Sequence, residues 1–336
     1  MGIDIGGTKV MAGVVDGAGK VLAIKQRPTL GHDVKAVEDT IVELVQSFAT
    51  KYDVAAVGIG AAGFVDATRS IVMFSPHLEW RREPLRARVA SRLRVPVVVD
   101  NDANAAALAE SRFGAGRGHR FVLCVTLGTG IGGALVIDQR VYRGANGMAG
   151  EFGHMQVVPQ GHRCECGNRG CWEQYASGNR LVRDARELVR ANSPMAHHLS
   201  NLVGGDADAL QGPQITAAAK EGDPLSIELI AEIGGWLGVG LAGLTAAFDP
   251  HCIIIGGGLS AAGDLLVEPT RQSFARSLTG RGHRDEPVIV AAELGPRAGF
   301  VGAADMARSA ARRSRKVRVR RTRQRTPRRL LRSERS

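Results

Sequence analysis

Aromatic residues are scarce in this chain of 336 residues, at 4%, and no apolar run reaches the roughly 18 residues that a membrane-spanning helix needs. The sequence therefore predicts a core of Val, Leu, Ile and Ala and argues against a membrane protein. No secretory leader precedes the first expected strand, and five cysteines, an odd number, do not fit a disulfide framework. We expect a cytoplasmic protein with reduced thiols, in which Cys124 and Cys252 are small core residues.

Charge is distributed unevenly along the chain. There are 44 Lys and Arg against 33 Asp and Glu, a net charge of +11. The segment 308–336 holds 14 of the basic residues and one acidic residue, which leaves 30 basic and 32 acidic side chains before it. We expect this segment to be disordered, because it has few large apolar residues and repels itself. It is either an arm that binds polyanions nonspecifically or an accidental extension of the coding sequence.

Four potential metal ligands lie within GEFGHMQVVPQGHRCECGNRGCWEQ: His154, Cys164, Cys166 and Cys171. Three thiolates and one imidazole form the closed tetrahedral donor set of structural zinc. Glu151 and Glu173 flank these ligands. A metal here would fix two carboxylates and an imidazole in positions that suit the hydroxyls of a small polyol. A zinc knuckle with no ligand nearby is the alternative.

A glycine-rich turn lies near the start of the chain. The apolar strand of GIDIGGTKV runs into four turn residues that precede a second strand: Gly6, Gly7, Thr8 and Lys9. Paired glycines at a strand turn let backbone N–H groups approach an anion, and Thr8 adds a hydroxyl. Asp4, at the end of the first strand, could hold a hydrated Mg²⁺. The Walker A spacing is missing, and an ordinary hairpin is the alternative.

Two further glycine clusters follow expected strands. The first, after FVLCVTL, opens with Gly128, Thr129 and Gly130 and fits the G-x-G-x-x-G pattern of a dinucleotide site. That site needs a helix next, whereas ALVIDQRVY alternates as a strand does, so we interpret the loop as a phosphate-facing hairpin turn. The second, after the strand CIII, precedes a helical pattern, where a nucleotide commonly binds: Gly256, Gly257 and Gly258.

Polar residues follow a buried strand between the first two glycine loops. The strand VPVVV leads into Asp100, Asn101 and Asp102 and then into a helix-forming run. Residues at the carboxyl ends of such strands face the crevice of an open α/β sheet. Asp102 could therefore accept a proton from a sugar hydroxyl, and Asn101 could bind an adjacent one. Capping of the helix is the alternative, but one cap does not need three polar residues.

The motifs DIGGTK, GIGAAGFVD, SPHLEW, VDNDANAAALAE, VTLGTGIGGALV, GEFGHM, CECGNRGCWEQYASG and IIIGGGLS occur in the order seen in the ROK family of repressors, open reading frames and kinases. The chain resembles this family over about residues 2–306, and within it the ATP-dependent glucokinases of actinobacteria. The resemblance implies an α/β, actin-like (ribonuclease-H-like) two-domain ATPase fold with a structural zinc segment. It implies a small lobe over 1–112, a large lobe over 113–294 and a helix over 295–307 that returns to the small lobe. No internal sequence repeat is visible.

The resemblance also implies roles for individual residues, with Asp102 as the base that activates the sugar 6-hydroxyl. It assigns sugar contacts to Asn101, Asp102, Glu151, His154, Glu173 and the backbone near Gly63. It assigns zinc to His154, Cys164, Cys166 and Cys171. It assigns phosphate and magnesium contacts to Asp4, Gly6, Gly7, Thr8, Lys9, Gly128, Thr129 and Gly130. It places the adenosine beside Gly256, Gly257 and Gly258.

Three positions depart from the family pattern. Ala62 precedes Gly63 where Pro is usual, His77 stands where Asn is common, and the first strand begins almost at Met1, as if the start had been assigned late. His162 is close to the cysteines in sequence, but the family pattern gives the ligand role to His154, so we expect His162 at the surface.

The sequence thus predicts a glucokinase that transfers the γ-phosphoryl group of MgATP to the 6-hydroxyl of glucose, as a dimer or tetramer with structural Zn²⁺. A kinase for fructose, mannose or N-acetylglucosamine and a polyphosphate-using glucokinase are the nearest alternatives. A sugar-sensing repressor is disfavoured, because its helix-turn-helix would precede DIGGTK.

Overall fold

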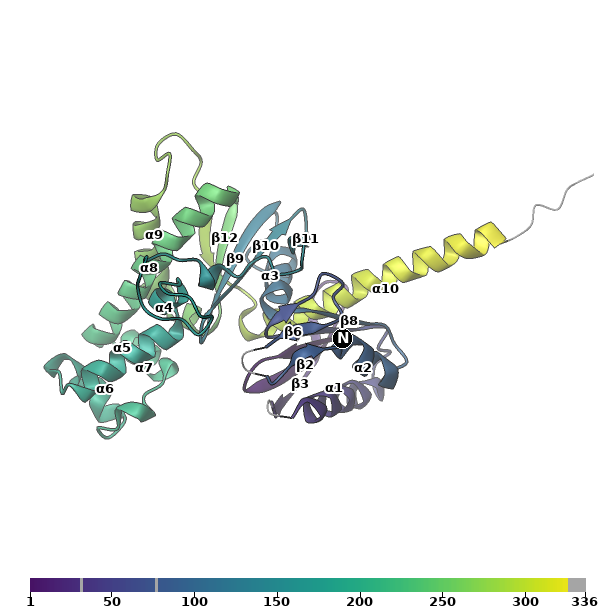
Figure 1. The fold of residues 1–336 in the computed structure, drawn as a ribbon, viewed down its shortest axis with the longest axis horizontal. Helices are drawn as coiled ribbons and strands as arrows, with labels where there is room; N and C mark the ends of the chain where they lie inside the picture. The colour runs from purple at the N-terminus through teal and green to yellow at the C-terminus, as the bar shows by residue number, and fades with distance from the viewer. Residues whose placement is uncertain (31–32, 76–77, 326–336) are drawn as a thin grey trace, which may run out of the picture.

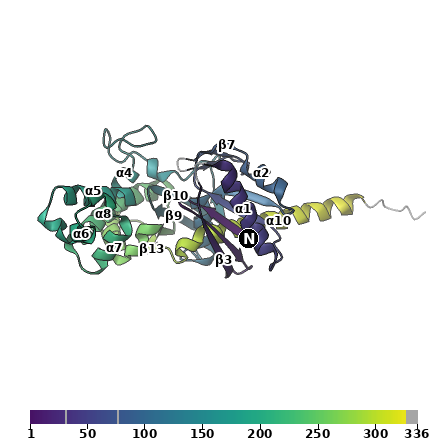
Figure 2. The same cartoon turned by 90° about the horizontal axis from the view of Figure 1, so that it is seen from below.

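The structure, a computed structural model, describes residues 1–30, 33–75 and 78–325, with side chains as far as residue 312. It has two lobes, each built on a five-stranded mixed sheet, and the lobes lie side by side in two views (Figures 1 and 2). The α/β two-domain fold predicted from the sequence is confirmed. His77 lies outside the described residues, so the prediction about it stays open.

The first sheet carries the N-terminal motif. Its strand order is β3-β2-β1-β4-β8. The strands are β1 (Gly2–Ile5), β2 (Lys9–Val15), β3 (Val21–Pro28), β4 (Val57–Ala61) and β8 (Val97–Asn101). The first three strands are antiparallel, whereas β1, β4 and β8 are parallel, so their carboxyl ends meet at one edge. That edge presents the glycine turn, the segment after Ala61 and the polar residues after Val99 together.

Helices cover both faces of this sheet. The amphipathic helix α1 (Val34–Ala49) and α2 (Leu85–Arg92) bury Ile41, Leu44 and Val89 against one face. The other face is covered by α3 (Asp102–Phe113) and by the start of α10 (Ala298–Arg325). The latter helix lies directly on the strands, because a Cβ atom added to Gly58 would be 1.8 Å from the Ala303 carbonyl oxygen.

The second sheet repeats the topology of the first. Its order is β11-β10-β9-β12-β13, again with an antiparallel meander followed by parallel strands. Its strands are β9 (Phe121–Leu127), β10 (Ile131–Ile137), β11 (Arg140–Tyr142), β12 (Cys252–Gly256) and β13 (Val288–Ala291). The alternating run after the second glycine loop is therefore a strand, as predicted. The two sheets share a topology but no recognisable sequence similarity, so this structural repeat could not be found in the sequence.

The large lobe adds a helical layer to the second sheet (Figure 1). The helices are α4 (Glu173–Ala176), α5 (Gly178–Arg190), α6 (His197–Leu202), α7 (Gly212–Lys220), α8 (Pro224–Phe248) and α9 (Asp264–Ser277). Among them α8 is long and apolar enough to cross a membrane, but 61% of that apolar stretch is buried inside the fold. It is the core helix of this lobe: a Cβ atom on its Gly240 would lie 2.2 Å from the Trp172 ring.

Short elements complete the chain. A small sheet beside the first one has strands β5 (Phe64–Val65), β6 (Val72–Phe74) and β7 (Arg81–Glu83). The 3-10 helices are η1 (Phe152–His154), η2 (Pro194–Ala196), η3 (Ala207–Ala209), η4 (Gly258–Ala262) and η5 (Gly295–Arg297).

The C-terminal helix runs further than the sequence predicted. Disorder was expected from Arg308, whereas the structure describes α10 as continuing to Arg325 (Figure 1). Arginine is a good helix former, and no glycine or proline interrupts the sequence between Gly302 and Pro327. The boundary at residue 307 also divides a packed region, since Arg308 donates a hydrogen bond to the Val15 carbonyl at 2.9 Å and pairs with Asp305. Residues 326–336 lie outside the described part of the chain.

Candidate active site between the lobes

A cavity of 290 Å³ opens between the two sheet edges. Its lining brings together all six sugar-contact residues predicted from the sequence and residues of two of the predicted glycine loops: Gly6, Gly7, Gly63, Asn101, Asp102, Gly128, Thr129, Gly130, Glu151, His154 and Glu173. Several convergent polar groups in a concave site are the usual signature of a small-molecule pocket.

Asn101 and Asp102 stand where β8 passes into α3. Asn101 is the N-cap, and its side-chain oxygen accepts a hydrogen bond from the Asn104 amide at 3.0 Å. Its Nδ2 donates to the Gly63 carbonyl and to Asp102 Oδ1, both at 3.0 Å. The capping alternative therefore holds for Asn101, which also lines the cavity, while Asp102 is the first helical residue with its carboxylate held at the cavity wall.

Gly63 forms the cavity wall beside Asn101, which donates a hydrogen bond to its carbonyl. Its φ of +127° lies in a region that favours glycine, and a Cβ atom there would be 2.3 Å from the Phe74 carbonyl oxygen. The turn after β4 is therefore formed with Ala62 in place of the usual proline.

Three acidic groups converge at the cavity. Burial raises the pKa of Glu151, and the charges of Asp102 and Glu173 raise it further, while His154 opposes them. The His154 Nδ1 atom lies 3.4 Å from Glu173 Oε1. Carboxylates and an imidazole so arranged offer several hydrogen-bond acceptors to a ligand rich in hydroxyl groups.

The four predicted metal ligands come together beside this cavity. The ligand atoms of His154, Cys164, Cys166 and Cys171 all lie within 4.8 Å of one another. The Cys166 and Cys171 sulfurs are 3.6 Å apart, and Cys164 Sγ donates to Glu173 Oε1 at 3.1 Å. Exposed His162 stands outside the cluster, as expected, with its ring on Tyr175. The donor set and its compactness fit a tetrahedral zinc ion. The cluster shares His154 with the cavity, which favours the predicted link to a ligand site over the alternative of an isolated zinc knuckle.

The two glycine loops face each other across the cleft, but not all of their residues reach it. Gly6 and Gly7 line the cavity, whereas the side chains of Thr8 and Lys9 are exposed on the turn. In the second loop, a Cβ atom on Gly130 would lie 2.4 Å from Glu173 Oε2. Only glycine at position 130 therefore lets the loop approach Glu173 this closely.

Asp4 lies deeper in the cleft, at the end of β1. It shares a smaller cavity of 160 Å³ with Asp102, Gly256 and Gly257. Burial, with the negative charge of Asp102, raises the pKa of Asp4 to about 7, and Lys9 opposes the shift. A divalent cation bound between two carboxyl groups at the bottom of a cleft would stabilise their ionised forms.

The third glycine cluster differs from the prediction. Gly256–Gly258 lead into the 3-10 helix η4, and α9 begins only at Asp264, after Gly263 turns the chain with φ +61°. The cluster instead packs on the second loop, because a Cβ atom on Gly257 would lie 2.3 Å from the Leu127 carbonyl oxygen.

A second, larger cavity was not predicted from the sequence. It has a volume of 580 Å³ and a mostly apolar lining from the second glycine loop, α5, α7 and η4: Leu127, Gly128, Thr129, Gly178, Asn179, Leu181, Val182, Gly212, Pro213, Thr216, Ala217, Lys220, Gly258, Leu259 and Ala261. The Gly178 amide donates to the Gly128 carbonyl at 2.9 Å, so the N-terminus of α5 is tied to the loop. The S-G pair at Ser177–Gly178 was the available sequence signal for this helix start.

The pattern that describes the ROK family matches residues 1–310. The chain belongs to the ROK family. It is 48% identical over 308 residues to the glucokinase of Streptomyces coelicolor, covering 92% of this chain and 97% of that protein. The crystal structure of a ROK family glucokinase from Streptomyces griseus in complex with glucose and AMPPNP superposes with a TM-score of 0.85 at 48% identity, covering 92% and 98%. The xylose repressor of Bacillus subtilis, another ROK relative, is 28% identical over 82% of this chain and 68% of its own length.

Proposed function

We propose that this chain is a glucokinase that transfers the γ-phosphoryl group of MgATP to the 6-hydroxyl of glucose. The observation that carries the proposal is the juxtaposition of Asn101 and Asp102 on one lobe with the second glycine loop and Glu173 on the other, around one cavity. A close relative bound to glucose and an ATP analogue supports the same pair of ligands for this chain.

Asp102 is the general base in this proposal. It accepts the proton of the sugar 6-hydroxyl as that oxygen attacks the γ-phosphorus, while Asn101 and Glu151 hold the neighbouring hydroxyls. Loop amides from Gly6, Gly7 and Gly128–Gly130 neutralise charge on the phosphates. Phosphoryl transfer depends mostly on such positioning and electrostatic stabilisation, which is what facing loops on two lobes provide.

The two cavities divide the ligands. The 290 Å³ cavity takes the sugar, and the apolar 580 Å³ cavity beside Gly128 and Gly258 takes the adenosine. They share Gly128 and Thr129, where the phosphates would pass from one to the other. Asp4 is the residue that would hold a hydrated Mg²⁺, which would neutralise the phosphate charges when bound.

Zn²⁺ would be bound by His154, Cys164, Cys166 and Cys171 in a structural role. Bound there, it would fix the loop that carries His154 and orient Glu173, both of which line the sugar cavity. A closed set of four protein ligands leaves no position for substrate on the metal itself.

Closure of the lobes completes the site in this proposal, with boundaries near residues 112 and 294. Glu110 supports these boundaries, because its carboxylate accepts hydrogen bonds at both chain crossings: from Ala115 at 3.1 Å, and from Glu293 at 3.1 Å and Leu294 at 2.8 Å. The same carboxylate thus holds both segments that connect the two lobes.

We further propose that the enzyme is a cytoplasmic homo-oligomer, a dimer or tetramer. Light scattering on the purified chain tests this oligomeric state.

Measurement of the sugar phosphate formed from glucose, fructose, mannose or N-acetylglucosamine tests the proposal, with ATP and inorganic polyphosphate compared as donors. Glucose with ATP should give the highest kcat/KM. A higher kcat/KM for another hexose would contradict the assignment of glucose as the sugar. A higher kcat/KM with polyphosphate would contradict the assignment of ATP as the donor. No turnover with any pair, together with sugar binding, would favour the repressor branch of the family.

A further inference from the structure

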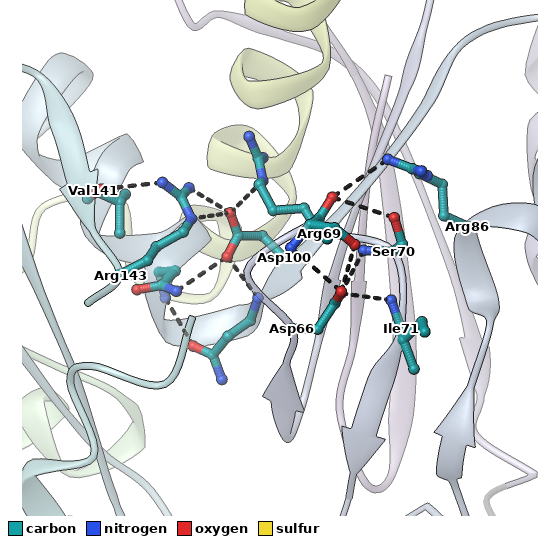
Figure 3. Close-up of polar contacts among 11 residues, drawn as sticks. Asp66, Arg69, Ser70, Ile71, Arg86, Asp100, Val141 and Arg143 are labelled. Carbon is teal, nitrogen blue, oxygen red and sulfur yellow. Dashed lines mark hydrogen bonds and ion pairs between the residues drawn. The ribbon is translucent and has the colours of Figure 1, made fainter. Parts of the chain in front are cut away.

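Asp100 precedes the catalytic pair but contacts neither cavity. Its side chain is 2% exposed and is surrounded by charged and polar groups from three segments of the chain (Figure 3). Its Oδ1 accepts hydrogen bonds from the Asn101 amide and from Asn104 Nδ2, both at 3.0 Å. One carboxylate oxygen is therefore used within the strand–helix junction that carries Asn101 and Asp102.

The other oxygen binds an arginine of the large lobe. Arg143 follows β11, and its Nε donates to Asp100 Oδ2 at 2.9 Å while Nη2 pairs with the same oxygen. The Nη1 atom of Arg143 donates to the Val141 carbonyl at 3.0 Å, which holds the guanidinium in place. This ion pair joins the end of β8, in the first lobe, to the edge of the second sheet.

A second arginine reaches Asp100 from the small sheet. Arg69 Nε lies 3.0 Å from Asp100 Oδ2 (Figure 3). Arg69 stands in the turn between β5 and β6 with φ +58°, a conformation that non-glycine residues rarely adopt. Asp66 fixes this turn by accepting hydrogen bonds from the Ser70 and Ile71 amides, both at 2.8 Å. The same small sheet begins beside Gly63, which accepts from Asn101.

We infer that Asp100 is a positioning residue for phosphoryl transfer: with Arg143 and Arg69 it fixes Asn101 and Asp102 relative to the large lobe and to the sugar wall at Gly63. The inference rests on the proposed function. A buried carboxylate bound by two guanidinium groups holds its neighbours in place, because removing the carboxylate takes the shared partner from both arginines and removing one arginine leaves a single cation to hold the buried charge. A shift of the base by about 1 Å can lower the rate roughly 100-fold.

Asp100→Asn tests the inference, because it keeps the size of the side chain and removes its charge. We expect kcat to fall about 10–100-fold, while the glucose dissociation constant stays within about threefold, since Asp100 does not line the sugar cavity. Amide hydrogen exchange should become faster in peptides that cover residues 64–74 and 140–145, a readout that needs no turnover.

Arg143 provides a second series, which remains decisive if Asp100→Asn does not fold. The kcat should decrease in the order wild type, Arg143→Lys, Arg143→Gln, because lysine restores the charge but cannot form the two-nitrogen contact. The matched control is Asp138→Asn, which breaks an exposed pair with Arg120 at 2.8 Å on the same lobe and should leave kcat unchanged.

The inference is overturned if kcat of Arg143→Gln and of any soluble Asp100→Asn stays within twofold of wild type, or if exchange in both peptides is unchanged. A loss of glucose affinity as large as the loss of kcat would also overturn it. Failure of the proposed function has a different signature, since wild-type protein would then show no glucose turnover while the exchange result still stands.

Discussion

Asp102 is the residue on which the proposed chemistry depends most. Replacement by asparagine keeps the acceptor for Asn101 Nδ2 but removes the base. We predict that kcat of Asp102→Asn falls by about 10²–10⁴ while glucose binding changes by less than about tenfold. Steady-state kinetics and calorimetry measure the two effects. A variant that keeps more than half of the wild-type kcat would place the base elsewhere.

Cys166 allows the role of zinc to be separated from catalysis. Metal analysis should find one zinc per chain, and Cys166→Ser should lose it because only three ligands remain. Since the metal orients His154 and Glu173, the KM for glucose should rise more than the KM for ATP, and thermal stability should fall.

The matched control for this substitution is Cys252→Ala. That cysteine is buried in β12, away from the cluster, so the variant should keep its zinc and its glucose KM. Active enzyme without zinc, or an unchanged glucose KM in Cys166→Ser, would contradict the assignment.

Most residues of the candidate site could be predicted because they stand in local motifs. The His/Cys spacing indicated four ligands that the fold brings together, and DNDAN indicated the cavity wall. The exposed side chains of Thr8 and Lys9 could not be foreseen, since a turn sequence does not say which way its side chains point. The role of Asp100 could not be predicted, because its arginine partners lie 31 and 43 residues away in the sequence.

At the scale of single elements, α7 makes a wall of the apolar cavity. Ala217 on this helix is exposed to the cavity, so a large side chain there would occupy space assigned to adenosine. We predict that Ala217→Phe raises the KM for ATP at least about tenfold and leaves glucose binding unchanged. Ala18→Phe, in the exposed turn between β2 and β3, is the control and should change neither. Equal KM values for ATP in both variants would show that adenosine does not bind in this cavity.

The junction of α1 with β7 gives a pH-dependent prediction. Burial, followed by the charge of Glu83, raises the pKa of Glu38. The ionised form therefore opposes folding above the folded-state pKa, and the penalty disappears as pH falls to the unfolded value of 4.5. Glu38→Gln should raise Tm by about 2 °C at pH 8 and by less at pH 5. Calorimetry at pH 8 and pH 5 measures the gain in Tm of Glu38→Gln at each pH. A larger gain in Tm at pH 5 than at pH 8 would contradict the prediction.

Element types were predicted better than element ends. Apolar alternation correctly predicted the hairpin of β1 and β2 and the strand after the second glycine loop. The helical segment after Trp172 is divided into α4 and α5 at Ser177, whose side chain caps the second helix. Such divisions follow from tertiary contacts, here the bond from Gly178 to Gly128, which no local pattern contains.

At the scale of the whole molecule, the end of α10 decides where the folded body stops. A chain ending at Arg312 should keep its kinase activity within about twofold, because it retains Arg308 and its contacts with Val15 and Asp305. A chain ending at Ala307 should lose these contacts and have a lower Tm. Thermal melts of the two truncated chains make the comparison. Equal Tm values would mean that Arg308 contributes nothing.

The same truncation tests the basic segment as a partner surface. A chain ending at Arg312 has 32 basic and 32 acidic residues, so it should no longer be retained by a cation exchanger. Full-length protein should bind polyphosphate or DNA with an affinity that falls steeply as salt rises. A functional arm should also change the kinase kinetics when the polyanion is bound, whereas an accidental extension should not.

The position of α10 also has a consequence for biosynthesis. The face of the first sheet that α10 covers is formed by the earliest residues of the chain, and Phe300 and Ala304 complete that packing nearly 300 residues later. While the ribosome is translating the large lobe, α3 is already present on this face, but the part that α10 covers stays exposed. We therefore expect the nascent first lobe to expose apolar surface until translation is almost complete, and we expect chains that end before residue 298 to aggregate rather than form an independently folded lobe.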